Sequence, residues 1–376
     1  MKLRSILALC LSFALAAARG AEPPFPPIAA RAWLVMDATS GQVLGAQKAN
    51  ERVEPASLTK IMTAYIAFEA LKEKRLTLEQ SVPVSERASK VGGSRMFIRP
   101  GSPVTVGELL QGMIVQSGND ACIALAEAIA GTEEAFAEHM NREARRLGLA
   151  NTHFTNSNGL PDPAHYSTAQ DLALLASALI RDFPEQYQRY YSQKEFRYNN
   201  ITQRNRNRLL WLDPNIDGVK TGQTDAAGYC LIASAKRDKR RILSVVLGAA
   251  SESARAQESQ KLLNHAFLNY DSVPLYAKGK PVNELPVWKG SEHTVKAGVA
   301  SDLYVTVPKG MADRLTAEFI SRQPLFAPIP AGQPVGTIRV SLEGKALGEY
   351  PAVALDSVSV AGVFGRTVDT VRLWFK

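Results

Sequence analysis

The sequence predicts an α+β domain, built from an antiparallel sheet with helices on its faces, followed by a small all-β domain. Strand patterns stand at both ends of residues 25–272, and helical periodicity fills the part between them. After about residue 275 this periodicity ends, and apolar residues alternate with polar ones as in half-buried strands. If the early and late strands join in one sheet, helices from the middle of the chain cover it.

The first domain opens with a β-hairpin pattern. Arg31–Asp37 and Val43–Ala46 are predicted strands, joined by a turn at Thr39–Gly41. A helix is expected from Pro55, because proline is well tolerated in a first helical turn and apolar residues follow at helical spacing. Three further segments have helical spacing, namely residues 106–130 (interrupted at Gly118), 169–181 and 253–270. Three runs are rich in β-formers, namely Ile216–Thr221, Tyr229–Ala235 and Ile242–Gly248.

The second domain is predicted over residues 275–360. Leu303, Val305 and Val307 alternate with polar residues, and so do Ile338, Val340 and Leu342, after which Glu343–Lys345 forms a turn. This pattern is typical of strands with one buried face.

Residues 1–20 have the features of a secretory signal peptide. Lys2 and Arg4 form a positive start, an apolar stretch follows, and Ala18-Arg19-Gly20 places small residues at the −3 and −1 positions of a cleavage site. A buried first helix or a membrane anchor is the alternative, but the apolar run is shorter than the ~20 residues that a span needs. We therefore expect an exported protein.

The last segment, residues 363–376, is predicted to be an amphipathic helix. Phe364, Val368, Val371 and Phe375 recur at helical spacing, with Trp374 beside them. This composition is typical of an interfacial membrane anchor. A terminal helix or strand that docks on the β-domain is the alternative, and the sequence does not decide between them.

Composition narrows the function classes. Residues 1–20 hold Lys2, Arg4 and Arg19 and no acid, so their removal lowers the formal net charge from +8 to +5. A mildly basic exported protein suits anionic lipid or wall polymers nearby. The sequence shows no nucleic-acid motif and no metal-ligand spacing, so neither nucleic acid nor a metal or other cofactor is expected. Cys122 and Cys230 remain after removal of the signal peptide, either as two buried thiols or as one disulfide.

Three short motifs, in this order, point to serine acyl transfer without a histidine. They are Ser57-Leu-Thr-Lys60, Ser117-Gly-Asn119 and Lys220-Thr-Gly222. Each alone has a plain structural interpretation, as a solvated helix face, a capping turn and a strand that ends in a turn. Together they supply a nucleophile, two candidate bases and an anion-binding strand edge.

The spacing explains how the nucleophile could be activated. Ser57 and Lys60 lie at i and i+3 of the predicted helix, so their side chains share a face. A lysine is a base only if burial or a nearby cation lowers its pKa, and Lys220 is the expected cation. The Ser117 hydroxyl can relay a proton, and the Asn119 amide can bind a substrate carbonyl or hold Lys60. Gly222 removes bulk where a substrate backbone could approach.

The motifs resemble those of the low-molecular-mass penicillin-binding proteins, specifically the serine D-alanyl-D-alanine carboxypeptidases that carry a C-terminal β-domain. The resemblance runs from about residue 28 to the end and includes Glu54-Pro-Ala-Ser-Leu-Thr-Lys60, Gln116-Ser-Gly-Asn-Asp-Ala121 and Asp217-Gly-Val-Lys-Thr-Gly222. It implies a serine β-lactamase/transpeptidase-like fold for residues 25–272, followed by the β-domain.

The resemblance also implies the catalytic roles. Ser57 would be acylated by the D-alanyl carbonyl of a peptidoglycan stem pentapeptide, with Lys60 as general base. Ser117 would pass the proton to the leaving D-alanine, and water would then hydrolyse the acyl-enzyme. β-Lactam antibiotics would mimic the terminal dipeptide and acylate the same serine.

Further residues would bind the substrate. Asn119 would bind the peptide, and Lys220, Thr221 and Arg255 would hold its terminal carboxylate. The backbone N–H groups of Ser57 and Gln223 would form the oxyanion hole. The substrate-binding set implied in this way is Asn119, Lys220, Thr221, Gly222, Gln223 and Arg255.

The sequence departs from some relatives at two places. Gln223 stands where some carry histidine, and Asn158-Gly159-Leu160 stands where some carry His-Gly-Leu on a loop that bears on deacylation. A class A β-lactamase would need a glutamate on the loop between the second and third motifs, and residues 150–175 contain none. The β-domain also argues against that class.

Two further function classes share parts of the pattern. A DD-endopeptidase would use the same site, but such relatives commonly lack the C-terminal domain or carry a large insertion between the first two motifs. Only residues 61–116 separate Lys60 from Ser117 here. A non-enzymatic wall-binding protein has no need of a chemically complete nucleophile–base pair. We therefore predict a periplasmic carboxypeptidase that trims peptidoglycan, attached peripherally to the outer face of the cytoplasmic membrane through residues 363–376.

Overall fold

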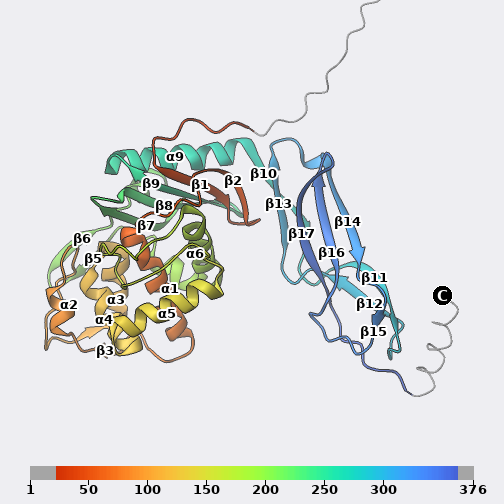
Figure 1. Ribbon diagram of the computed structural model, residues 1–376, viewed down its shortest axis with the longest axis horizontal. Coiled ribbons are helices and arrows are strands. Elements are labelled where there is room, and N and C mark those ends of the chain that lie inside the picture. The colour runs from red at the N-terminus through yellow and green to blue at the C-terminus, as the bar shows by residue number, and fades with distance from the viewer. Residues whose placement is uncertain (1–22, 363–376) are drawn as a thin grey trace, which may run out of the picture.

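A five-stranded antiparallel sheet organises the first part of the protein in the computed structural model, which describes residues 23–362 (Figure 1). The strand order β2-β1-β9-β8-β7 joins the first hairpin to strands that come about 180 residues later. The antiparallel sheet predicted from both ends of the domain is thereby confirmed. The strands are β1 (Ala32–Asp37), β2 (Gln42–Gln47), β7 (Ile216–Thr224), β8 (Gly228–Arg237) and β9 (Arg240–Ala249).

Helices cover both faces of this sheet. Leu34 and Met36 of β1 face a large core shared with most of the helices, whereas Trp33 and Val35 face a second core under α9 (Glu252–Asn269). Alternate residues of one strand therefore feed opposite cores, which explains why β1 is apolar throughout. The helices on the other face or at the end of the domain are α1 (Lys60–Lys72), α2 (Glu86–Lys90), α3 (Val106–Gln111), α4 (Asn119–Ala130), α5 (Glu133–Arg146), α6 (Ala169–Asp182) and α7 (Pro184–Tyr190). The short helix α8 (Leu209–Leu212) instead adds Leu209 and Leu210 to the core under α9.

Two of the predicted helices have irregular starts or interruptions. The helix expected from Pro55 begins as a 3₁₀ turn over Ala56–Thr59 and becomes an α-helix only at Lys60. The stretch 106–130 consists of α3, a π-helical turn over Gly112–Gln116 and α4, with Ser117 left-handed at φ 68° between them. Both irregular points coincide with catalytic motifs, where regular hydrogen bonding gives way to other contacts.

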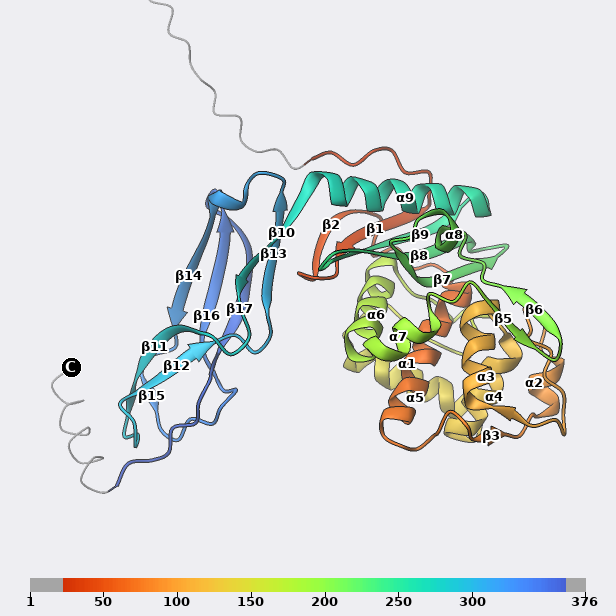
Figure 2. The same cartoon turned by 180° about the vertical axis from the view of Figure 1, so that it is seen from behind.

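Several elements were not predicted. They include α5, although Phe136, Met140 and Ala144 follow its N-cap Thr132 at helical spacing. Two short hairpins also form, as the strand pairs β3 (Ser81–Val82) with β4 (Val104–Thr105) and β5 (Glu195–Tyr198) with β6 (Ile201–Arg204). Figure 2 shows the β5–β6 hairpin at the end of the domain that faces away from the C-terminal strands.

The chain changes to an all-β architecture at Tyr270, where α9 ends and β10 begins. A six-stranded sheet of order β14-β16-β17-β12-β11-β15 packs beside the pair β10-β13, and these strands have their own two cores. The alternation predicted around Val305 and Val340 is confirmed, because both side chains are fully buried. The strands are β10 (Tyr270–Tyr276), β11 (Pro281–Trp288), β12 (Thr294–Gly298), β13 (Leu303–Pro308), β14 (Leu315–Ser321), β15 (Leu325–Phe326), β16 (Pro334–Leu342) and β17 (Lys345–Ala354), with a 3₁₀ turn at Ala312–Arg314.

Polar contacts join the two parts of the molecule. The buried carboxylate of Asp37 accepts hydrogen bonds from Thr306 Oγ1 of β13 at 3.0 Å and from Arg240 Nε at 2.8 Å. Gln42 binds the backbone of the same threonine through both its amide nitrogen and its amide oxygen. The end of the β1–β2 hairpin therefore holds the C-terminal domain against the first sheet.

Both predicted terminal segments, the signal peptide at residues 1–20 and the amphipathic segment at 363–376, lie outside the described residues. Between residues 23 and 362, none of the helices combines the length and the apolar character that crossing a membrane requires.

Candidate active site

The predicted nucleophile lies at the start of α1. Ser57 is half-buried in the 3₁₀ turn, between the buried residues Ala56 and Leu58. Lys60 is the first residue of α1, only 1 % exposed, and its Nζ lies 2.8 Å from Ser57 Oγ. The i and i+3 spacing therefore brings the two side chains together, as predicted.

Three oxygen atoms surround the Lys60 amine. Besides Ser57 Oγ, these are Asn119 Oδ1 at 2.8 Å and the backbone carbonyl of Asn158 at 2.5 Å. The two carbonyl oxygens are acceptors only. A neutral amine must therefore give its two hydrogens to them, which leaves its lone pair for the Ser57 hydroxyl. The geometry selects the orientation in which Lys60 can take the serine proton.

Burial makes this neutral form accessible. Removal from water lowers the pKa of Lys60 from 10.5 to about 8, and the charge of Arg206 adds a smaller lowering. The sequence predicts Lys220 as the cation with this effect. Lys60 and Lys220 do repel each other's charge, and Arg206 adds to this effect on Lys60. Arg206 is an exposed residue between β6 and α8 for which no hydrogen-bond partner is found within residues 23–362.

The second and third motifs meet beside this pair. Lys220 Nζ of β7 donates to Ser117 Oγ at 3.0 Å and to the carbonyl of Thr221 at 3.1 Å. Burial, followed by the charge of Lys60, lowers the pKa of Lys220 well below its ordinary value. The left-handed backbone at Ser117 turns the chain between the π-helical turn and α4. The Ser117 hydroxyl therefore lies within hydrogen-bond distance of a buried amine.

The rest of the third motif forms the wall opposite α1. Thr221 is buried, Gln223 is exposed, and Arg255 of α9 donates to the Gly222 carbonyl at 3.2 Å. A Cβ at Gly222 would lie 3.1 Å from the carbonyl oxygen of Pro55. The small residue therefore lets β7 pack against the segment that carries Ser57, whereas its expected role in substrate approach stays a prediction.

A loop between β-bridge residues 153 and 166 closes the site from the other side. The backbone N–H of Thr155 donates to His165 Nδ1 at 3.1 Å, so the ring proton is on Nε2, which donates to Thr59 Oγ1 at 2.8 Å. Burial lowers the pKa of His165 to about 4, so the ring is neutral at physiological pH. This loop also provides the Asn158 carbonyl for Lys60.

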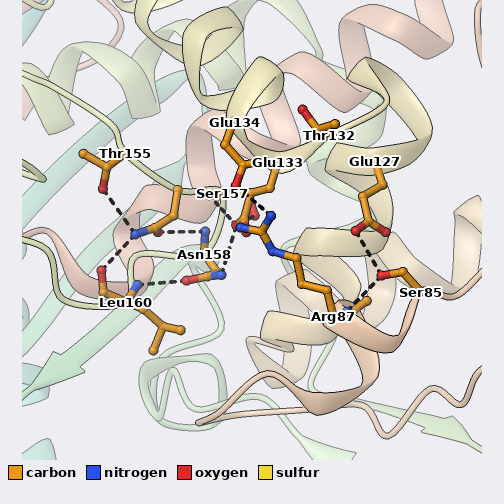
Figure 3. Close-up of polar contacts among 12 residues, drawn as sticks. Ser85, Arg87, Glu127, Thr132, Glu133, Glu134, Thr155, Ser157, Asn158 and Leu160 are labelled. Atoms are coloured by element: carbon orange, nitrogen blue, oxygen red, sulfur yellow. Dashed lines mark hydrogen bonds and ion pairs between the residues drawn. The ribbon is translucent and has the colours of Figure 1, made fainter.

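A buried carboxylate also binds this loop. Glu133, at the start of α5, accepts hydrogen bonds from Ser157 and Asn158 and forms an ion pair with Arg87 of α2 (Figure 3). A groove of about 450 Å³ opens along this network. Asn158 lines this groove, and its carbonyl also binds Lys60, so the groove lies next to the predicted catalytic residues.

Comparison with known proteins identifies this constellation. Residues 17–251 match the family model D-alanyl-D-alanine carboxypeptidase, and residues 270–360 match the model for the C-terminal domain of penicillin-binding protein 5. The chain belongs to the D-alanyl-D-alanine carboxypeptidase family. The predicted enzyme class, the predicted fold and the resemblance on which they rested are thereby confirmed.

Family members of similar length share both domains. D-alanyl-D-alanine carboxypeptidase DacC of Escherichia coli (strain K12) is 44% identical over 358 residues, covering 93% of this chain and 89% of the relative. DacA of the same organism is 40% identical over 382 residues, covering 98% and 94%. Among solved structures, penicillin-binding protein 5 from Haemophilus influenzae superimposes with a TM-score of 0.84 at 39% identity, covering 90% of this chain and 99% of the other.

Other reactive side chains lie away from the predicted catalytic residues or are buried. Cys122 and Cys230 are free and fully buried, which resolves the choice left open from the sequence. Burial raises the pKa of Cys122 to about 12 and that of Cys230 to about 11. The ligand atoms of Glu69, His139 and Glu143 lie within 4.8 Å of one another, a cluster that no sequence spacing suggested. Its two carboxylates already face Arg146, at 3.9 Å from Glu69 and 2.6 Å from Glu143.

Proposed function

We propose that the protein removes the terminal D-alanine from peptidoglycan stem peptides ending in D-Ala-D-Ala, through an acyl-enzyme on Ser57. The observation that supports this most directly is the arrangement around Lys60. Two carbonyl acceptors, from Asn119 and Asn158, orient the amine so that its lone pair faces the serine hydroxyl. A serine with a neighbouring base in this position is an activated nucleophile.

Acylation then proceeds in two steps, attack by the serine and departure of the amine. Ser57 Oγ attacks the carbonyl carbon of the penultimate D-alanine while Lys60 accepts the hydroxyl proton. The backbone N–H groups of Ser57 and Gln223 stabilise the oxyanion that forms. As the C–N bond breaks, Ser117 gives its proton to the leaving amine and regains the one that Lys60 took from Ser57, so Lys60 is neutral again for deacylation. Lys220 Nζ, at 3.0 Å, holds the Ser117 hydroxyl in place for this relay. D-Alanine departs with a neutral or protonated amine.

Substrate recognition rests on two buried basic side chains, Lys220 and Arg255, of which Arg255 also pairs with Glu252 at 3.3 Å. Lys220, Thr221 and Arg255 line one wall, and we propose that they hold the terminal carboxylate of the peptide. Asn119 already binds Lys60 through its oxygen and the Gly92 carbonyl through its nitrogen. Its role in holding Lys60 is thus supported by contacts, and its binding of the peptide remains part of the proposal.

Hydrolysis of the acyl-enzyme by water completes the cycle, with Lys60 as the nearest base. β-Lactams resemble the terminal dipeptide, and we propose that they acylate Ser57 as well. A related solved structure, penicillin-binding protein D2 from Listeria monocytogenes in the ampicillin-bound form, has a TM-score of 0.60 at 30% identity and covers 65% of this chain.

The decisive experiment measures D-alanine release from a peptide that ends in D-Ala-D-Ala. The wild-type protein should release D-alanine, and Ser57→Ala should retain only background catalysis, on the order of 10³–10⁴-fold over water. A peptide ending in L-Ala-L-Ala serves as the control for stereospecificity. Equal release by both proteins would show that Ser57 is not the nucleophile, and no release by the wild type would refute the activity.

We further propose that the chain consists of a signal peptide at residues 1–20, a catalytic domain at 25–272 and a β-domain at 275–360. The protein would be exported to the periplasm. Residues 363–376 would rest on the outer face of the cytoplasmic membrane, with the β-domain raising the active site toward the wall. Deletion of residues 362–376 should release the protein from membranes without loss of D-alanine release; unchanged membrane association would refute this role.

A further inference from the structure

We propose that Glu133 is a positioning residue for acylation, which fixes residues 157–158 so that the Asn158 carbonyl orients the Lys60 amine toward Ser57. This inference rests on the proposed function and adds to it a residue outside the three motifs. Glu133 does not touch the reacting groups. It acts through the loop that does.

The contacts of Glu133 use both of its carboxylate oxygens. Oε1 accepts from the backbone N–H of Ser157 at 3.1 Å, the Ser157 hydroxyl at 2.7 Å and the Asn158 side-chain amide at 3.3 Å. Oε2 accepts from Arg87 at 2.7 Å. Figure 3 shows these contacts converging on the carboxylate from two sides. With its side chain only 5 % exposed, Glu133 is an acceptor for three loop donors and for one cation.

The same two loop residues bind α1 with their other atoms. The Ser157 carbonyl accepts from Thr63 Oγ1 at 2.6 Å, and the Asn158 carbonyl accepts from Lys60 Nζ at 2.5 Å. Thr63 and Lys60 lie one turn apart on α1. Residues 157–158 therefore bridge α5 and α1, donating toward Glu133 and accepting from α1. Glu133 thus fixes the backbone N–H and hydroxyl of Ser157 and the side-chain amide of Asn158, which leaves little freedom to the two carbonyls of the same residues.

Loss of the carboxylate would expose Lys60 to water. The groove lies along the outer side of this bridge, lined in part by Arg87, Glu133 and Asn158. A displaced segment would let water from the groove replace the Asn158 carbonyl. The amine would then be better hydrated and its lone pair no longer directed at Ser57.

The titration of Lys60 reports this change because its other charged neighbours come from different elements. His165, on the loop itself, stays neutral over the tested range because burial lowers its pKa to about 4. Asp120 and Cys122 lie on α4, Lys220 lies on β7 and Arg206 precedes α8. Substitution of Glu133 leaves all four side chains in place. A shift in the pH dependence of acylation would therefore report a change in how well residues 157–158 shield the Lys60 amine from water.

The test compares Glu133→Gln with Glu134→Gln in the full-length protein. Glu134 is the matched control because it pairs with the same Arg87 at 2.7 Å but is 69 % exposed and has no loop contact among the described residues. Acylation rates with a fluorescent penicillin are measured from pH 5.5 to 10, and folding is checked by thermal unfolding. For Glu133→Gln we expect acylation at pH 7 to fall roughly 10–100-fold, as for other supporting residues of active sites. We also expect its rising limb to move up by about one pH unit. Glu134→Gln should match the wild type.

A second variant keeps the proposal testable if Glu133→Gln folds poorly. Ser157→Ala removes one donor to Glu133. The rising limb of its acylation rate against pH should move in the same direction as that of Glu133→Gln, by a smaller amount. A folded Glu133→Gln protein whose rising limb lies at the wild-type pH would overturn the proposal. Uniformly lower rates would not rescue it, because partial unfolding lowers the acylation rate equally at every pH. Failure of the proposed function is distinguishable, since the wild type itself would then not be acylated.

Discussion

Gly159 offers a sharp test of how closely the loop must approach the nucleophile. Its φ of +82° is left-handed, and a Cβ there would lie 1.8 Å from the carbonyl oxygen of Ala56 and 2.8 Å from Thr59 Oγ1. Both of these residues belong to the turn that carries Ser57. Gly159→Ala must therefore separate the loop from the nucleophile segment or strain both.

The matched change is Gly148→Ala, just after the end of α5. Gly148 also has a left-handed φ, of +76°, but nothing lies within 4 Å of the position that a methyl group would take there. Both substitutions force an alanine into the left-handed region, at roughly 1 kcal/mol each. Only Gly159 adds an overlap, and ordinary contact begins at 3.4 Å, so the methyl group and the Ala56 oxygen must move apart by about 1.6 Å. Displacements of ~1 Å near reacting groups cost roughly 10²-fold in rate.

We therefore expect Gly159→Ala to slow acylation of Ser57 by at least about 100-fold and to lower the free energy of unfolding by roughly 2–4 kcal/mol. Gly148→Ala should acylate at the wild-type rate and lose only about 1 kcal/mol. Fluorescent-penicillin labelling measures the first quantity and denaturant unfolding the second. Equal behaviour of the two variants would refute the close packing of Gly159 on Ala56.

Three further predictions concern charges. Because the pKa of Lys60 is about 8 and the neutral amine is the base, the acylation rate should rise about tenfold per pH unit below pH 8 and level off above it; a flat profile from pH 6 to 9 would contradict this. Asp37→Ala removes one partner of a buried ion pair with Arg240, and unfolding measurements should show a loss of about 3–5 kcal/mol. The same change at the exposed Glu51 should cost less than ~1 kcal/mol. Because the charge of Arg206 lowers the pKa of Lys60, Arg206→Gln should move the rising limb of the acylation rate to higher pH, and an unchanged limb would exclude this electrostatic effect.

Local patterns were sufficient to predict most of the regular elements. The strand β1 and the helices α6 and α9 follow directly from apolar spacing, because β1 is buried on both faces and each helix buries one stripe against a core. The three motifs could be brought together in advance because their chemistry is complementary. The irregular backbone at Ala56–Ser57 and at Ser117 could not be predicted, since it depends on tertiary contacts that spacing does not encode.

The residues that sequence reasoning missed act through contacts over long separations. Arg206 affects Lys60 across about 146 positions of the chain, and His165 binds Thr59 across 106. No short motif signals either one. Asn158 attracted notice only as a departure from relatives, because its contribution to Lys60 is a backbone carbonyl, which every residue has. Sequence reasoning therefore found the residues whose side-chain chemistry is distinctive and missed those that contribute position or charge.

The absence of a glutamate from residues 150–175 argues against a class A β-lactamase. A glutamate from another element, Glu133, does reach this loop. Its two oxygens, however, accept from Arg87, Ser157 and Asn158, so the carboxylate is held by protein donors and is not directed at a deacylating water. The presence of Glu133 beside the loop therefore does not favour a β-lactamase. Here it stabilises the loop that orients Lys60, and we expect deacylation to depend on the lysine as base.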